Sequence, residues 1–164
     1  MEIYLLRHAI AVPSDTAGLA DEDRELTEEG FSKMTKGARG FSELVDDFDL
    51  IVSSPLKRAV QTSEIIVKEM GLEKKVLVSD ILLPSKKTDE VIDFLEEHSG
   101  NARVLLIGHE PLLSRLAGTL CGTNRHIIDI KKGGLCRVDV TDPSFIKAGV
   151  LVWNLAPKHL RMMA

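Results

Sequence analysis

Residues 3–8 read Ile-Tyr-Leu-Leu-Arg-His, a short apolar run that ends on two polar side chains. A run of this length that changes abruptly to polar residues is typical of a buried β-strand. Similar runs occur at Leu50-Ile51-Val52, at Val76–Val78 and at Val104–Ile107, and each is followed by apolar residues at helical spacing. Strands that alternate with helices in this way predict a mostly parallel sheet inside a three-layer α/β/α sandwich.

The expected helices begin and end at residues that are common at helix ends. Thr27 is a suitable N-cap for the first helix, whose apolar positions from Phe31 to Val45 would face the core. The next three helices are expected between Ser54 and Gly71, between Thr88 and Gly100, and between Pro111 and Gly122. After them, 135–140 and 150–155 predict two strands separated by Asp142-Pro143, an antiparallel hairpin at the edge of the sheet.

Length and composition place limits on the kind of protein. The 164 residues, 44% hydrophobic and 28% charged, fit one globular domain over 1–164. A formal net charge of -4 argues against a general nucleic-acid or membrane-surface binder. No apolar run approaches the roughly 20 residues that span a bilayer. The two cysteines, Cys121 and Cys136, predict neither a disulfide framework nor a zinc site, so we expect a cytoplasmic protein with reduced thiols.

Three of the predicted strands end on groups suited to binding phosphate. They supply Arg7-His8, then Ser53-Ser54 with Arg58 close behind, and His109-Glu110. In an open parallel sheet, ligands bind beyond the carboxyl ends of the strands, so these groups should converge on one crevice. Arginine forks and helix N-termini together form an anion site, and phosphate is the obvious ligand.

The residue types also suggest a reaction. A neutral histidine can act as a covalent nucleophile, and arginines beside it disfavour the imidazolium form. His8 is therefore the expected nucleophile, while His109 is better suited to donate a hydrogen bond to the phosphoryl oxygens. Capping or solvated roles for these side chains, and phosphate binding without chemistry, remain open from the residues alone.

The same residues carry a family resemblance. Residues 5–9, Leu-Leu-Arg-His-Ala, resemble the Arg-His-Gly signature of the histidine phosphatase (phosphoglycerate mutase-like) superfamily. Residues 53–62 and 108–111 resemble its second and third motifs, and 24–30 resemble its usual link into the first helix. The short chain, Gly108–Leu112 and the closing stretch from Trp153 to Leu160 are most similar to the SixA-type phosphohistidine phosphatases.

The resemblance implies a phosphoglycerate mutase-like fold and a division of labour in the site. His8 would become phosphorylated, Arg7, Arg58 and His109 would hold the phosphate, and water would release it without a metal or organic cofactor. Arg24 is a further candidate for substrate binding. The implied reaction is removal of phosphate from a phosphorylated histidine of a phosphorelay protein, such as a phosphotransfer domain, with neither nucleic acid nor membrane as a partner.

Two departures from the family pattern affect this expectation. Ala9 replaces the common glycine and fits only if its φ is negative. The stretch between Gly71 and Arg103 is too short to hold the insert that carries a general-acid carboxylate in larger members. Asp80 is the nearest candidate acid, with Glu110 behind it, although solvated or capping roles suit both carboxylates.

A missing acid favours a phosphohistidine substrate, because a nitrogen leaving group can arrive already protonated whereas an alkoxide leaves poorly without a proton donor. Two alternatives stay open. One is a small-molecule phosphomonoesterase or mutase with the same His8 nucleophile, and the other is a non-catalytic phosphate-binding adaptor. A metal hydrolase is disfavoured because the sequence lacks a clustered set of carboxylates and histidines.

Overall fold

The computed structural model describes residues 1–141 and 148–164 and has a six-stranded sheet at its centre, in the order β3-β2-β4-β1-β5-β6. The pairs β3-β2, β2-β4 and β4-β1 are parallel. The pairs β1-β5 and β5-β6 are antiparallel. The predicted mostly parallel sheet with an antiparallel edge is thus confirmed. The strands are β1 (Glu2–Arg7), β2 (Leu50–Ser53), β3 (Leu77–Val78), β4 (Arg103–Gly108), β5 (Leu135–Asp139) and β6 (Val150–Leu155).

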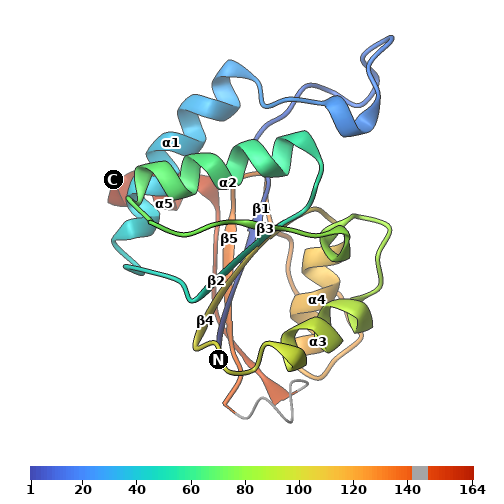
Figure 1. The fold of residues 1–164 in the computed structure, drawn as a ribbon, viewed down its shortest axis with the longest axis vertical. Coiled ribbons are helices and arrows are strands. Elements are labelled where there is room, and N and C mark those ends of the chain that lie inside the picture. Colours follow the sequence, from blue (N-terminus) through green and yellow to red (C-terminus); the bar gives the residue numbers. More distant parts are fainter. Residues whose placement is uncertain (142–147) are drawn as a thin grey trace.

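Helices cover both faces of the sheet, which confirms the three-layer architecture (Figure 1). One face carries α1, α2 and α5, and the other carries α3 and α4. The loop that follows β1 projects at the end of the molecule opposite the N-terminus (Figure 1). The helices are α1 (Glu28–Ser42), α2 (Lys57–Glu69), α3 (Thr88–Glu97), α4 (Leu112–Leu120) and α5 (Pro157–Met163).

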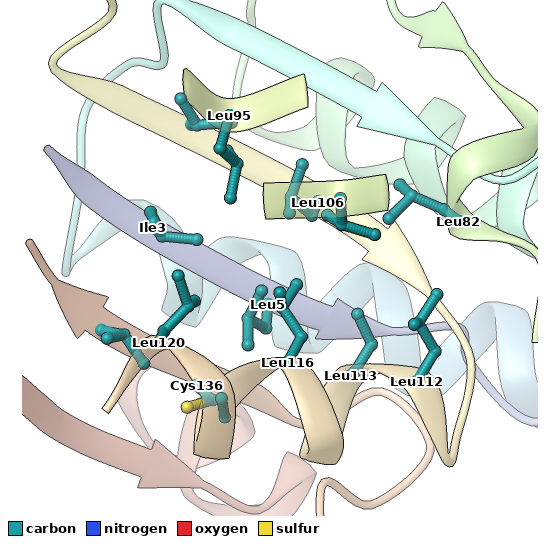
Figure 2. Packing of buried hydrophobic residues seen from close by; sticks show 14 of the residues in the cluster. Ile3, Leu5, Leu82, Leu95, Leu106, Leu112, Leu113, Leu116, Leu120 and Cys136 are labelled. Carbon is teal, nitrogen blue, oxygen red and sulfur yellow. The ribbon is translucent and has the colours of Figure 1, made fainter. Parts of the chain in front are cut away.

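Strand β1 is apolar throughout because both of its faces are buried. Ile3 and Leu5 point into the cluster beneath α3 and α4, whereas Tyr4 and Leu6 point into the cluster beneath α1, α2 and α5. Figure 2 shows Leu5 beside Leu116 of α4 in the first of these clusters. A central parallel strand that is covered on both faces reads as a continuous apolar run rather than as an alternating pattern.

Most of the predicted helix ends are confirmed, and two starts are corrected. The Thr27 hydroxyl accepts a hydrogen bond from the Gly30 amide at 3.0 Å, as expected of the N-cap of α1. Thr88 is the first residue of α3 rather than its cap, and the Glu90 carboxylate accepts the Lys87 amide there at 3.2 Å. Ser54 lies ahead of α2, which begins at Lys57, and its hydroxyl accepts the amide of the N-cap residue Leu56 at 3.4 Å.

Helix α1 buries the predicted positions Met34, Ala38 and Phe41, whereas Phe31, at the start of the predicted apolar stripe, is 39% exposed. Its buried side includes glycines at close contacts with neighbouring backbone. A Cβ on Gly30 would lie 2.0 Å from the Ile10 carbonyl oxygen, and one on Gly40 would lie 1.7 Å from the carbonyl oxygen of Leu160 in α5. These glycines let α1 press against both α5 and the loop that follows His8.

The remaining expectations concern the C-terminal strands and the cysteines. Both strands are confirmed, while the predicted turn at Asp142-Pro143 lies outside the described residues. Cys136 is buried and Cys121 is partly buried, and both are free thiols. In the described part of the chain, no helix has the length and apolar character needed to cross a membrane.

Candidate active site

Three neighbouring parallel strands, β2, β4 and β1, bring the predicted groups together at their carboxyl ends. The Ser54 amide donates to the Ile107 carbonyl at 2.9 Å, and the His8 amide donates to the Gly108 carbonyl at 3.0 Å. These bonds extend the strand pairing by one residue. As a result, the rings of His8 and His109 lie with their centroids 5.0 Å apart.

The backbone that follows His8 determines how its ring is protonated. Nδ1 of His8 lies 2.7 Å from the Ala9 carbonyl oxygen, which can only accept a hydrogen bond. Nδ1 therefore carries the proton, and Nε2 keeps its lone pair. A carbonyl partner of this kind is the usual way in which a protein selects one imidazole tautomer.

Ala9 fits its position without strain. No non-glycine residue in the described ranges has a positive φ, so alanine meets the condition that replacing the usual glycine requires. Its amide donates to the hydroxyl of Thr62 at 3.1 Å, and that hydroxyl donates to the Arg58 carbonyl at 2.6 Å. The His8 loop is thus tied directly to the first turns of α2.

Both histidines are held in the neutral form. Burial, the neighbouring His109 and the cations Arg58 and Arg7 lower the pKa of His8 to about 2, although the hydrogen bond to Ala9 opposes the shift. Burial and Arg58 lower the pKa of His109 to about 3. Nε2 of His109 lies 2.8 Å from the Ser54 hydroxyl.

We expect these two histidines to make the protein less stable below pH 6.5. They stay neutral when folded but take up protons near pH 6.5 when unfolded, so the unfolded chain binds more protons between about pH 3 and 6.5. The free energy of unfolding should fall by roughly 2 kcal/mol per histidine between pH 8 and pH 5. Urea titrations across this range measure the change.

His8→Asn and His109→Gln provide the controls for this pH dependence. Each should remove about half of the histidine contribution, and the difference from wild type cancels the carboxylates that titrate in both proteins. Parallel stability profiles for wild type and variants would contradict the neutral state of the buried rings.

Three buried nitrogen atoms at this site have no hydrogen-bond partner in the described part of the protein. They are Nε of Arg7, Nε of Arg58 and Nδ1 of His109, and no other buried side-chain nitrogen or oxygen in residues 1–141 and 148–164 is left in this way. Buried polar groups are normally paired, so a cluster of unpaired ones calls for a ligand. Two guanidinium groups and an imidazole are suited to the oxygen atoms of an anion.

Asp21 lies at the edge of this cluster and was not predicted from the sequence. It is in the 3-10 turn η1 (Asp21–Asp23), and its carboxylate joins Arg24, at 2.6 Å, to Arg58, at 3.0 Å. The Asp21 carbonyl also accepts from Nη1 of Arg58 at 2.6 Å. Partial burial opposes ionisation, but the hydrogen bonds from both arginines keep the pKa of Asp21 below its usual value.

The structure places Arg24 behind this contact rather than among the unpaired groups. Its side chain is 8% exposed, and its Nε donates to the Val12 carbonyl at 2.7 Å. Asp21 therefore links Arg24 to Arg58, and the two arginines share one carboxylate. Arg24 contributes charge to the site from this position.

Within the described residues, neither candidate acid forms a hydrogen bond or ion pair with the residues that carry the unpaired nitrogen atoms. Asp80 is exposed in the turn η2 (Asp80–Leu82), and its side chain makes no hydrogen bond or ion pair within the described ranges. Glu110 is nearer, because its negative charge acts on Arg7, but its carboxylate accepts the Ser114 hydroxyl at 2.7 Å.

The segment before β5 supplies further contacts that the sequence did not signal. The Gly133 amide donates to the carbonyls of Arg7 and His8, at 3.0 and 3.1 Å, with Gly133 at φ 74°. Nη1 of Arg7 donates to the Ile130 carbonyl at 2.9 Å. Burial and the positive charges of Arg7, Arg24 and Arg58 lower the pKa of Lys132, which places this lysine at the rim of the site. Residues 130–134 thus bind the backbone of Arg7 and His8 through hydrogen bonds, and Lys132 adds a positive charge nearby.

The chain is similar to known proteins in both sequence and fold. The model of the histidine phosphatase superfamily (branch 1) matches residues 3–80. The structure of the protein histidine phosphatase SixA complexed with tungstate matches with a TM-score of 0.86 at 26% identity, covering 98% of this chain and 99% of that one. The chain belongs to the histidine phosphatase superfamily. The match also confirms the expected phosphoglycerate mutase-like fold.

Further matches show how far the likeness extends. The phosphohistidine phosphatase SixA of Escherichia coli is 26% identical over 165 residues, covering 99% of this chain and 98% of its own. An uncharacterised protein of Picosynechococcus sp. is 34% identical over 140 residues, 82% of each chain. The α-ribazole-5′-P phosphatase structure from Escherichia coli, at 16% identity and a TM-score of 0.76 over 96% of this chain and 98% of that one, shares the fold.

Proposed function

We propose that this histidine phosphatase superfamily member is a phosphohistidine phosphatase. It removes phosphate from a phosphorylated histidine of a phosphorelay protein through a covalent phospho-His8 intermediate. The observation that carries the proposal is the set of unpaired nitrogen atoms on Arg7, Arg58 and His109 beside a neutral His8. The same geometry suits a phosphoryl group, whose charge spreads over its oxygen atoms during transfer.

The first step forms a bond between Nε2 of His8 and phosphorus and breaks the bond between phosphorus and the imidazole of the substrate. The electron pair returns to the substrate nitrogen, and an imidazole with a proton on its other nitrogen leaves as a neutral ring. On His8, the bond from Nδ1 to the Ala9 carbonyl stabilises the positive charge that develops on the phosphorylated ring.

Water completes the cycle. Its oxygen bonds to phosphorus, the bond from phosphorus to Nε2 breaks, and the electron pair returns to His8. A proton of the water passes to a phosphate oxygen, so the product is inorganic phosphate. Within the described residues, no group of three or more His, Cys, Asp or Glu side chains could hold a metal ion. The chain's own side chains carry both steps as written.

The carboxylates near the site support a nitrogen leaving group over an oxygen one. Asp21 is held ionised by Arg24 and Arg58, and Glu110 accepts from Ser114. An alcohol that leaves phosphorus needs a proton, and a general acid contributes about 10² to 10⁴ to such a reaction. A phosphohistidine needs no such acid. The similarity to SixA, a phosphohistidine phosphatase by name, points the same way.

A substrate panel tests the proposal. It contains a phosphotransfer domain phosphorylated on histidine, p-nitrophenyl phosphate and 3-phosphoglycerate, each assayed with the wild-type protein. We expect kcat/KM for the phosphohistidine protein to exceed that for 3-phosphoglycerate by a factor on the order of 100 or more, because an alkoxide would have to leave without a proton donor.

The other outcomes decide between the alternatives. A strong preference for 3-phosphoglycerate would overturn the proposal and favour a small-molecule phosphomonoesterase or mutase. Binding of the phosphohistidine protein without release of phosphate would favour a non-catalytic adaptor. Rapid hydrolysis of p-nitrophenyl phosphate without hydrolysis of the phosphohistidine protein would also overturn the proposal and favour a phosphomonoesterase.

A further inference from the structure

A cavity of about 270 Å³ lies beside the His8 site, between α1, α5 and the segment that precedes β5. Its wall includes Ala9, the residue directly after His8, and Lys132. The positive charges of Arg7, Arg24 and Arg58 help to lower the pKa of Lys132. Gly133, which binds the Arg7 and His8 carbonyls, lines it as well. The cavity is therefore lined in part by residues that follow His8 in the chain or bind its backbone.

This cavity combines apolar and cationic surfaces. Ile10, Met34 and Pro157 provide apolar walls, and the charged residues among those that line it are all lysine or arginine. Lys33 is paired with Glu29. The remaining three cations, Lys132, Lys158 and Arg161, form no ion pair within residues 1–141 and 148–164.

The charge of the cavity contrasts with that of the whole chain. The protein carries a formal net charge of -4, yet three unpaired cations stand around one hollow beside its reactive residue. Lys132 and Lys158 are exposed, so their charges face outward, where another protein could meet them. Such a local field attracts an anionic partner and favours its correct encounter orientation.

We propose that this basic cavity receives an acidic segment of the phosphoprotein substrate, and this inference rests on the proposed function. A carboxylate of Asp or Glu on the substrate pairs with Lys158 and Arg161, and an apolar neighbour of that residue packs on Met34 and Pro157. A phosphohistidine carried by a protein necessarily brings flanking residues to the surface around His8. The cavity is where such residues meet both charge and apolar area.

The decisive experiment neutralises two rim cations and compares a protein substrate with a small one. K158Q/R161Q is assayed on a phosphohistidine phosphotransfer domain and on phosphoramidate, a small compound with the same type of P–N bond. We expect KM for the protein to rise about tenfold with little change in kcat, so the ratio of kcat/KM for protein over phosphoramidate falls about tenfold.

Two further variants keep the test independent of folding and of net charge. K36Q/K68Q removes the same charge from exposed positions outside the cavity and should leave the ratio unchanged. K158E changes one exposed side chain and should raise KM for the protein substrate by itself. Added salt should raise KM for wild type more than for K158Q/R161Q, because fewer attractions are left to screen.

The outcomes separate this inference from the proposed function. If wild type hydrolyses the phosphohistidine protein and K158Q/R161Q has the same KM, the docking role is wrong and the proposed function stands. An equal loss on phosphoramidate would make the cations part of the phosphate site and also overturn docking. If wild type hydrolyses phosphoramidate but not the phosphohistidine protein, the proposed function itself fails.

Discussion

His8→Ala is expected to lower phosphatase turnover by a factor on the order of 10⁴ or more, because the variant has no group that can take its place as nucleophile. Nε2 of His8 carries the free lone pair, since Nδ1 is committed to the Ala9 carbonyl. Steady-state release of phosphate from a phosphohistidine protein measures the effect.

The variant should nevertheless keep its affinity for a phosphate-like anion, because Arg7, Arg58 and His109 remain. Calorimetry measures the affinity of His8→Ala for tungstate. An affinity equal to that of wild type would show that the site is intact. Turnover at the wild-type rate would show that His8 is not the nucleophile, whatever the affinity for tungstate.

Arg58→Ala is expected to lower kcat/KM by about 10² to 10³, the usual cost of removing a group that stabilises developing phosphoryl charge. Its Nε is one of the three unpaired nitrogen atoms, while its terminal nitrogens bind Asp21. Removal of the Arg58 side chain also leaves Arg24 as the one arginine bound to the Asp21 carboxylate. The site then has one positive charge fewer near this carboxylate, and it attracts phosphate less. The rates are measured on phosphoramidate, which reports on the site without protein docking.

The neighbouring Lys57 offers a matched control. It carries the same charge in the same motif, but it is exposed and pairs with Glu25. Lys57→Ala should therefore change kcat/KM by less than about twofold. Arg58→Lys, which keeps the charge but loses the planar fork, should restore only a small part of the activity. Equal effects of Lys57→Ala and Arg58→Ala would mean that Arg58 acts only through its charge at a distance.

The parts of the site that follow from strand order could be predicted from the sequence. Arg7, His8 and His109 come directly after apolar runs, and parallel strands bring their carboxyl ends to one edge, so the sequence already places these residues together. These inferences depend on local pattern and on one general rule of sheet topology. The sequence left the consequence of Ala9 open, because the negative φ that alanine needs is a property of the folded loop.

Residues in loops could not be placed in the same way. Asp21 lies in an acidic turn that looks solvated in the sequence, and only the folded loop brings it onto Arg58 and Arg24. Lys132 and Gly133 precede β5, and the local sequence does not show that β5 pairs with β1. Phe31 is also 39% exposed although it shares the apolar spacing of the buried Met34 and Phe41, and that spacing alone does not separate the exposed position from the buried ones.

The position of Asp21 also changes the question of the general acid. The sequence suggested Asp80 or Glu110, but the carboxylate that binds Arg24 and Arg58 is Asp21, and these arginines keep its pKa below the usual value. An ionised carboxylate balances positive charge in the site but cannot donate a proton. The electrostatics thus favour substrates whose leaving group needs no proton, in line with the proposed phosphohistidine substrate.

The phosphorylated enzyme tests the central claim most directly. Wild type is mixed with a phosphotransfer domain carrying labelled phosphohistidine, quenched in alkali within one turnover, and the labelled residue is identified by mass spectrometry and ³¹P NMR. We predict one phosphate on Nε2 of His8, stable to alkali and labile to acid, and none on His8→Ala. Phosphate on Nδ1 of His8 or on another residue, or turnover with no phosphoenzyme at all, would contradict the account.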